Sequence, residues 1–339
     1  MKPSFRVLRR ASQLIFLALT LLLLSLPLGP RLFMQASPLA ALSASLASHA
    51  PVLAWGWLFL LLALPFGRFF CGWVCPLGTL NGLYGPRKPL AGRGLKLLLL
   101  FLLLFSAGMG LNLAGWFDPL SILTRAAATV SLVRGDPKQA LWLLPLGGIL
   151  LLNLFRRRFW CRILCPLGAL LGVASSLWSK GKRENCSDCK LCTSQCPQGA
   201  APPEGWLSPE CVLCGSCVER CPKQALTLRG EPSVSLPKRQ FLGALLLGTS
   251  LFLPWRKKDE TLRPPGAGED FLGKCVRCGA CLKACPTHAL QPSLFERGWE
   301  GLLTPRFSPR QGYCEPECTR CHEVCPTGAI KKRARIGLA

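Results

Sequence analysis

The amino-acid sequence predicts an α-helical membrane bundle of four helices, with a fifth segment, joined to two small α+β modules. Half of the 339 residues are hydrophobic, the mean hydropathy is +0.32, and the longest apolar runs lie in the first half of the chain. Sixteen of the 20 cysteines lie in the second half, in four short strings with nearly the same spacing. The apolar runs predict the bundle and the cysteine strings predict the modules.

Four apolar runs predict membrane-spanning helices, because each approaches about 20 residues with its flanks. Positive charges precede the first run and occur in 84–96 and 156–158, whereas 34–50 and 116–139 carry fewer. The positive-inside rule therefore places the N-terminus in the cytoplasm and makes 34–50 and 116–139 outer loops. A cleaved signal peptide is the alternative for the first run, but the later runs favour a retained helix. The runs are 14–28, 51–66, 95–113 and 140–155.

The cysteine strings predict iron–sulfur clusters. Each follows the spacing C-x2-C-x2-C-x3-C-P, except that three residues separate Cys314 from Cys318. Three closely spaced thiolates surround one cubane, and the fourth, before proline, reaches the neighbouring cluster in two-cluster ferredoxins. Zinc uses separated C-x2-C pairs and disulfides need no repeated spacing, so neither explains four copies.

Pairing the strings predicts four 4Fe-4S clusters in two ferredoxin-like modules, with ligands exchanged within each pair. In the first module one cluster takes Cys186, Cys189, Cys192 and Cys221, and the other takes Cys211, Cys214, Cys217 and Cys196. In the second module one cluster takes Cys275, Cys278, Cys281 and Cys325, and the other takes Cys314, Cys318, Cys321 and Cys285.

The formal net charge of +24 does not indicate nucleic-acid binding. Each cluster with its thiolates contributes about −2 when oxidised, which reduces the excess. The remaining Lys and Arg lie mostly beside apolar segments, where the positive-inside rule requires them. We therefore expect a lipid bilayer and no nucleic acid as the partner of these charges.

A second cysteine motif is repeated beside the apolar runs. Residues 67–85 and 157–175 each contain an aromatic pair followed by C-x3-C-P-L-G, with Cys71 and Cys75 in one copy and Cys161 and Cys165 in the other. On one helix, spacing of i and i+4 places both thiols on the same face. Two interpretations remain open: four buried, inert cysteines, or a redox role as ligands of a further metal centre or as the lining of a quinol pocket. Repetition favours the redox role, and no catalytic residue is assigned.

The region between the cysteine modules determines the topology. Its apolar part, 241–255, spans about 22 Å as a helix, less than the roughly 30 Å hydrocarbon core. It is predicted to be a fifth membrane segment, with a signal-like anchor or a helix on the membrane surface as alternatives. The predicted domains are 1–183 (bundle), 184–234 (first module, cytoplasmic), 235–255 (fifth segment), 256–270 (linker) and 271–339 (second module).

A few polar residues have candidate roles. Asp118 and His49 could accept protons from a quinol at the outer face, although Asp118 also fits an Asp-Pro turn that ends a helix. His288 and His322 lie beside cluster cysteines and are expected to tune them, not to bind iron. Arg68 is expected to anchor a helix at the membrane interface, although it could also face an anionic group.

The chain resembles two known families. The paired C-x3-C-P motifs followed by a two-cluster module make residues 1–230 similar to NapH, a membrane ferredoxin-type subunit. Residues 235–339 resemble NapG and its methylamine-utilisation relative, through FLGKCVRCGACLKACPTHAL and GYCEPECTRCHEVCPTGAI. The G-type family carries a twin-arginine signal, and the matching residues here are Lys238 and Arg239, so the first arginine is missing.

The resemblance implies an electron-transfer component of a quinol dehydrogenase-type system in the bacterial inner membrane. Electrons would pass from the membrane quinol pool to a periplasmic acceptor, a reductase of a nitrate reductase-like system or a cytochrome c, with the second module in the periplasm. A different interpretation is an electron donor or assembly factor for metalloenzyme maturation, with all clusters cytoplasmic. A structural anchor is the third.

Overall fold

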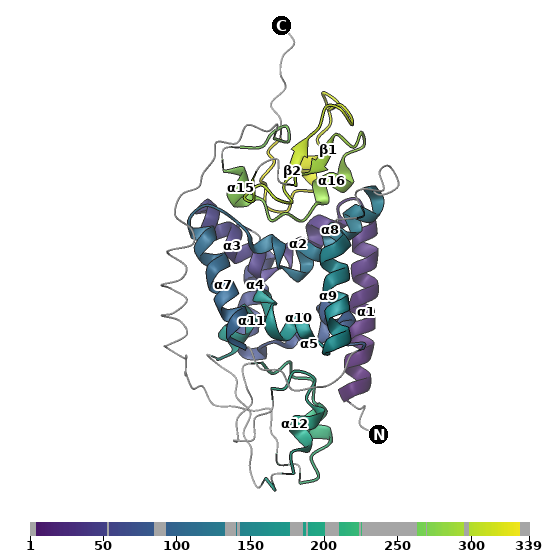
Figure 1. The fold of residues 1–339 in the computed structure, drawn as a ribbon, viewed down its shortest axis with the longest axis vertical. Coiled ribbons are helices and arrows are strands. Elements are labelled where there is room, and N and C mark those ends of the chain that lie inside the picture. Colours follow the sequence, from purple (N-terminus) through teal and green to yellow (C-terminus); the bar gives the residue numbers. More distant parts are fainter. Residues whose placement is uncertain are drawn as a thin grey trace. The chain divides into compact units, whose positions relative to one another are not determined.

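The computed structural model describes most of the chain, and the described residues are mostly helical (Figure 1). The predicted fifth segment, 235–255, lies outside the described residues, as do Lys238, Arg239 and the first part of the linker. The described residues are 5–52, 54–84, 93–132, 140, 143–176, 186–187, 189–200, 210–223, 225, 263–268, 270–294 and 298–332.

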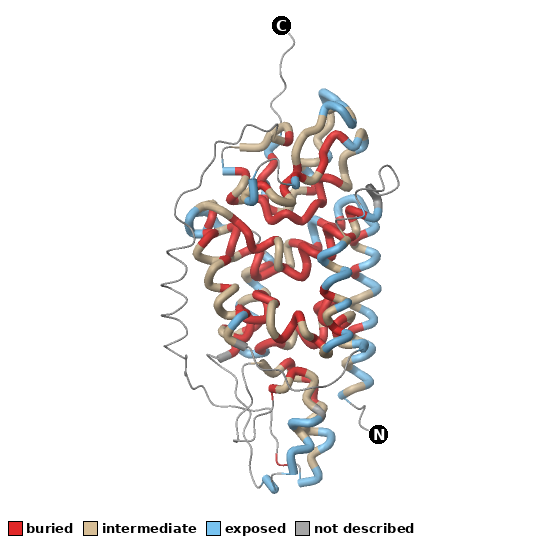
Figure 2. Tube along the Cα trace, viewed as in Figure 1, coloured by how far each residue is buried: buried red, intermediate tan, exposed pale blue. Residues whose placement is uncertain are grey.

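The four longest apolar runs coincide with helices, which are α1 (Phe5–Ser25), α4 (Ala54–Phe66), α7 (Arg93–Gly108) and α9 (Leu144–Phe155). Among the described residues, only α1 is long and apolar enough to cross a membrane. It lies near the N-terminus, where a signal sequence would have the same properties. Its Leu14 and Ile15 side chains are 63% and 64% exposed, as Figure 2 shows for much of this helix, which suits contact with lipid.

The described parts of the two segments expected as outer loops are largely helical. They contain α3 (Pro38–Ser48) and α8 (Pro119–Leu132), with α2 (Gly29–Gln35) and η1 (Ala114–Trp116) just before them. Ser37 caps α3, since its side chain accepts the Ala40 N–H at 3.2 Å, and proline occupies the first turn. Asp118 likewise accepts the Ser121 N–H at 3.0 Å, so this residue begins α8. The Asp-Pro interpretation, in which Asp118 ends a helix, was therefore wrong.

The chain folds into two compact units, and the boundary between them falls within α1, α4, α7 and α9. The sequence does not indicate this division, because it depends on contacts between distant segments. Unit 1 comprises Met1–Leu21, Leu58–Leu100 and Gly147–Ala244, and unit 2 comprises Leu22–Trp57, Phe101–Leu146 and Leu245–Ala339.

Each unit combines part of the helical region with one cysteine-rich module. Unit 1 holds the first module, with the short helices α12 (Leu191–Gln195) and α13 (Ser216–Glu219). Unit 2 holds the second module, with α15 (Phe271–Lys274), α16 (Ala280–Ala284) and α17 (Arg320–Glu323). There, β1 (Leu290–Pro292) pairs antiparallel with β2 (Pro305–Phe307), with Leu290 opposite Phe307.

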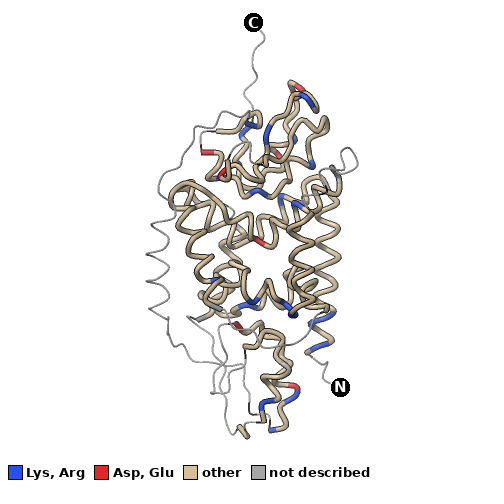
Figure 3. Tube along the Cα trace, viewed as in Figure 1, with Lys and Arg blue, Asp and Glu red and all other residues tan. Residues whose placement is uncertain are grey.

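The most apolar helices carry their charged residues at an end or carry none. Figure 3 shows Lys and Arg at the N-terminal end of α1, and α4 and α9 carry no charged residue. The core of unit 1 includes the fully buried Leu77, Leu167 and Leu171, which come from the repeated segments 67–85 and 157–175. The repeat therefore forms the packed centre of its unit.

Candidate iron–sulfur and thiol sites

Two cavities in the second module are lined by the two predicted ligand sets. Each set combines three cysteines of one string with the last cysteine of the other, and four thiolates are what a cubane requires. The fit is therefore good in number and in kind of donor. One cavity is lined by Cys275, Cys278, Cys281 and Cys325, and the other by Cys285, Cys314, Cys318 and Cys321.

Left-handed residues shape the loops around these cysteines. In the second string Leu213 and Gly215 have φ of 48° and 69°, and in the third string Arg277 and Gly279 have φ of 52° and 75°. The fourth string has one extra residue, and Thr319, which follows its second cysteine, has φ −113°. The irregular spacing thus coincides with a different loop conformation.

The first module also brings a predicted ligand set together. Burial, with smaller contributions from the neighbouring Cys214, Cys196 and Cys217, raises the pKa of Cys211 to about 12, although the Leu213 N–H acts to lower it. Leu213 N–H donates to Cys211 Sγ at 3.4 Å, and Ala200 N–H donates to Cys196 Sγ at 3.1 Å. Such N–H···S bonds stabilise thiolates that bind iron.

Cys186 and Cys189 of the first string are exposed, so the predicted set of Cys186, Cys189, Cys192 and Cys221 is the least enclosed of the four. Within the described part of the chain, no group of three or more His, Cys, Asp or Glu side chains is arranged to bind a single metal ion. A cubane separates its thiolates, because each one binds a different iron.

The C-x3-C pairs do not lie on continuous helices, so the expectation of a shared helix face was wrong. Cys71 lies in α5 (Phe69–Trp73), whereas Cys75 is extended, with φ −62° and ψ 116°, and precedes α6 (Pro76–Leu80). Cys161 and Cys165 repeat this arrangement around α10 (Phe159–Ile163) and α11 (Pro166–Ser176). Proline excludes the helical conformation from the residue before it and then occupies the first position of a new helix.

The break nevertheless brings the four thiols together. Cys75 and Cys165 cap their new helices, because each Sγ accepts a backbone N–H at 3.4 Å, from Gly78 and Gly168 respectively. All four cysteines are buried, and burial, followed by the neighbouring Cys71 and Cys161, raises the pKa of Cys75. We call Cys71, Cys75, Cys161 and Cys165 the four-thiol site.

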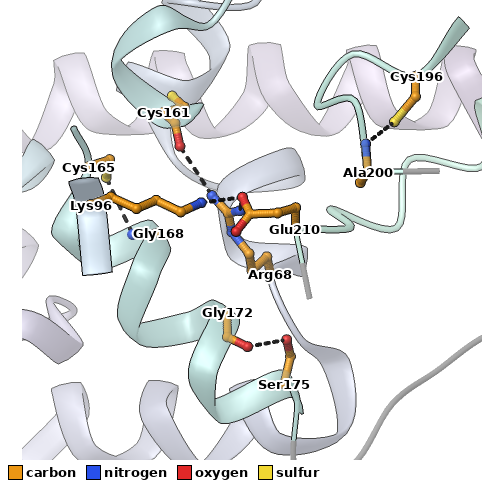
Figure 4. A network of polar contacts seen from close by, with 10 residues as sticks. All are labelled: Arg68, Lys96, Cys161, Cys165, Gly168, Gly172, Ser175, Cys196, Ala200 and Glu210. Carbon is orange, nitrogen blue, oxygen red and sulfur yellow. Dashed lines mark hydrogen bonds and ion pairs between the residues drawn. The ribbon is translucent and has the colours of Figure 1, made fainter. Parts of the chain in front are cut away.

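Arg68 links this site to the first module and faces an anionic group, as the alternative interpretation of this residue required. It is fully buried, and Figure 4 shows its guanidinium between Glu210 and the second C-x3-C segment. Arg68 and Lys96 both form ion pairs with Glu210, and Arg68 Nη2 also donates to the Cys161 carbonyl at 3.3 Å. Burial alone would raise the pKa of Glu210, but Arg68 and Lys96 lower it overall.

Arg158 is a buried residue that sequence reasoning missed. It occupies the position of Arg68 in the second copy of the repeat, and it is 0% exposed. Its Nε, Nη1 and Nη2 atoms have no hydrogen-bond partner among the described residues. An alignment of the two copies could have identified it, because arginine stands three residues before the first cysteine in both.

Each module rests on a Gly-Trp dipeptide within its own unit. In unit 1, a Cβ on Gly72 would lie 2.7 Å from the Val212 carbonyl oxygen, and Trp73 Nε1 donates to the Leu213 carbonyl at 3.3 Å. In unit 2, a Cβ on Gly115 would lie 1.9 Å from the Val276 carbonyl oxygen. Val212 and Val276 each follow the first cysteine of their string, so both contacts hold a ligand loop.

The Trp116 side chain completes the contact in unit 2. Its Nε1 donates to the Leu302 carbonyl at 3.2 Å, and the Arg277 guanidinium lies 5.7 Å from the centre of its ring. The Gly-Trp dipeptides were not identified from the sequence, because their partners are more than 130 residues away in the chain.

The remaining candidate residues are one aspartate and three histidines, and they differ in burial and in hydrogen bonding. Asp118 is fully buried, accepts hydrogen bonds from Ser37 Oγ and Ser121 Oγ at 3.0 Å, and has a pKa that burial raises. His49 and His288 are exposed. His322 Nδ1 lies 3.0 Å from the Ile330 carbonyl, which orients the ring beside the cluster string.

Family models and relatives agree with the iron–sulfur chemistry. A model described as a 4Fe-4S binding domain matches residues 48–94 and 139–185, a second of that description matches 211–225, and a 4Fe-4S dicluster domain matches 274–329. No solved structure is similar to this chain.

Three relatives each match part of the chain. The ferredoxin-type protein NapH of Escherichia coli is 32% identical over 50% of this chain, and the putative electron transport protein YccM of the same organism is 32% identical over 48%. The methylamine utilization ferredoxin-type protein MauM of Methylorubrum extorquens is 47% identical over 22% of this chain. The matches span 64%, 51% and 34% of these relatives respectively, so they cover only part of each.

Proposed function

Because the chain belongs to the NapH-type family of ferredoxin proteins, we propose that it is a membrane-bound electron-transfer protein with four 4Fe-4S clusters. It takes electrons from quinol and relays them to a periplasmic acceptor, a reductase of a nitrate reductase-like system or a cytochrome c. The observation that carries this proposal is the pair of cavities in the second module, each lined by four cysteines from two strings.

The four-thiol site adds a further redox centre to this relay. The residues 48–94 and 139–185, which match a 4Fe-4S binding domain, contain no cysteines besides Cys71, Cys75, Cys161 and Cys165. These four thiols are buried together, and four thiolates bind either a 2Fe-2S or a 4Fe-4S cluster. Such a group would accept and donate single electrons there.

The chain's own residues exclude water and position this site. Cys75 and Cys165 are oriented by the Gly78 and Gly168 N–H groups. The Trp73 indole, between Cys71 and Cys75, bonds to Leu213 beside Cys211 and Cys214. The four-thiol site therefore adjoins a ligand loop of the first module, within one compact unit, which suits electron transfer between them.

The direct test is reduction of the purified full-length protein by quinol. We expect menaquinol or ubiquinol to reduce at least one cluster, observed by electron paramagnetic resonance. If neither quinol reduces any cluster while dithionite reduces them, the quinol proposal is refuted. The membrane location of α1 is tested by carbonate extraction of membranes.

A second function, electron donation for metalloenzyme maturation with all clusters cytoplasmic, is favoured by one observation. Lys238 replaces the first arginine of a twin-arginine pair, and Arg256, Lys257 and Lys258 follow the apolar segment, where positive charge favours the cytoplasmic side. Protease or thiol-label access to residues beyond 256 distinguishes the two. Access from the cytoplasmic side would favour maturation, and access from the periplasmic side would favour respiration.

A further inference from the structure

We infer that Arg158 is the counter-charge of a metal centre at the four-thiol site and sets its reduction potential. This inference rests on the proposed function, because it requires a metal centre at these thiols. It assigns to Arg158 a positioning and electrostatic role, without direct binding of the metal.

The first observation is the missing partner. The Arg158 side chain is 0% exposed, and none of its three nitrogens has a hydrogen-bond acceptor among the described residues. A buried guanidinium without an acceptor or a counter-charge is strongly unfavourable. Arg68, its equivalent in the other repeat, is as deeply buried but has Glu210.

The second observation is the backbone of the same residue. Arg158 has φ 59° and ψ 33°, the left-handed conformation that side-chain-bearing residues rarely adopt. In the first repeat the left-handed residue is Gly67, which adopts this conformation without strain. Two unfavourable features in one residue indicate a functional constraint.

The third observation is what surrounds the guanidinium. Arg158 is the largest charge acting on the Cys161 thiol, and it also faces Arg9, a cation that reaches Cys214 of the first module. Glu210, the carboxylate near the four thiols, already pairs with Arg68 and Lys96. Among the described residues, the thiols of the four-thiol site are therefore the candidates for the negative charge that Arg158 lacks.

Metal binding supplies that charge. Thiols are neutral, whereas thiolates bound to iron are deprotonated outright, so a loaded site is anionic. Reduction adds one more negative charge. A nearby guanidinium stabilises the reduced state more than the oxidised state and raises the reduction potential.

The test is a redox titration of the full-length protein, followed by electron paramagnetic resonance. Four 4Fe-4S clusters account for about 16 irons, so a centre at the four-thiol site would add iron beyond that number. A Cys71→Ser, Cys161→Ser double variant first identifies this centre, because it should lose the additional iron and one paramagnetic signal. Arg158→Gln is then compared with Arg158→Lys, which keeps the charge. Arg157→Gln is the matched control, because Arg157 is the adjacent cation and donates instead to the Gly82 carbonyl.

We expect Arg158→Gln to lower the ratio of reduced to oxidised centre at least tenfold at a fixed potential, equal to a shift of about 59 mV for one electron. The Arg158→Lys and Arg157→Gln variants should remain within threefold of wild type. An unchanged potential in Arg158→Gln with full iron content would overturn the inference.

Failure of the proposed redox centre gives a different result from failure of the inference about Arg158. If the double serine variant retains all iron and all signals, the four-thiol site holds no centre, whatever Arg158 does. If Arg158→Gln loses the centre altogether, Arg158→Lys decides. A retained centre near the wild-type potential supports the role of the charge, and a lost centre shows that Arg158 acts through packing alone.

Discussion

The contact between Gly115 and the Cys275 ligand loop gives the sharpest prediction about stability. In Gly115→Ala the new Cβ would lie 1.9 Å from the Val276 carbonyl oxygen and 2.6 Å from its carbon. Ordinary contacts begin near 3.4 Å, so backbone must move by about 1.5 Å on one side. Overpacking of this kind costs about 1–3 kcal/mol, and here the yielding element carries cluster ligands.

The matched series is provided by other glycines. A Cβ on Gly72 would meet the Val212 carbonyl oxygen at 2.7 Å, a smaller overlap, whereas Gly147 in α9 and Gly108 in α7 have nothing within 4 Å. We therefore expect destabilisation in the order Gly115→Ala, then Gly72→Ala. The Gly147→Ala variant should be neutral or stabilised by up to about 1 kcal/mol, since alanine favours helices.

Two assays separate the effects. The melting temperature of the purified protein should fall by several degrees in Gly115→Ala, because each kcal/mol of destabilisation lowers it by about 2–4 °C. Iron release to a chelator should also accelerate, but only from the second module, because Val276 lies between Cys275 and Cys278. If Gly115→Ala and Gly147→Ala unfold and release iron alike, the contact does not support the ligand loop.

Three further predictions test other parts of the chain. Cys325→Ser should remove the cluster of the Cys275 string and leave the cluster of its own string, which Mössbauer spectroscopy would show as loss of one cluster; loss of the other instead would refute the exchanged pairing. Glu210→Gln leaves two buried cations without their carboxylate and should lower the free energy of unfolding by about 3–5 kcal/mol. The control Glu219→Gln breaks a partly exposed ion pair and should cost about 0–1 kcal/mol. Equal decreases in melting temperature for the two variants would contradict this prediction. Because burial raises the pKa of Asp118 above 3.8, its contribution to stability is complete below that pH and is lost as pH rises through the folded pKa. The melting temperature of Asp118→Asn should therefore gain on that of wild type as pH rises, and a constant difference would disprove the assignment.

The sequence was most informative where chemistry repeats at fixed spacing. The C-x2-C-x2-C-x3-C-P strings led to specific ligand sets, and two of these sets line separate cavities. Helices α3 and α8 were not expected in the two outer segments, although Ser37-Pro38 and Asp118-Pro119 are helix-start signals. The charge pattern indicates only the side of the membrane, whereas these local signals indicate where a helix begins.

Other features could not be predicted, because they depend on long-range contacts. Arg68 and Glu210 are 142 residues apart, and no periodicity links them. The helix break at Cys75, in contrast, could be predicted from the sequence, because the proline that follows Cys75 disfavours a helical conformation of that residue. The i, i+4 interpretation was wrong in a way that the sequence itself could have corrected.

The two Gly-Trp contacts differ in what lies beside them, and this difference bears on electron flow. In unit 1, Gly72 and Trp73 lie inside the C-x3-C motif, so the ligand loop of the first module rests directly on the four-thiol site. In unit 2, the equivalent dipeptide is followed two residues later by the buried Asp118, whose partner Ser121 also donates to the Val276 carbonyl at 3.4 Å. The first module therefore adjoins a site suited to electrons, and the second adjoins a carboxyl group that can hold a proton.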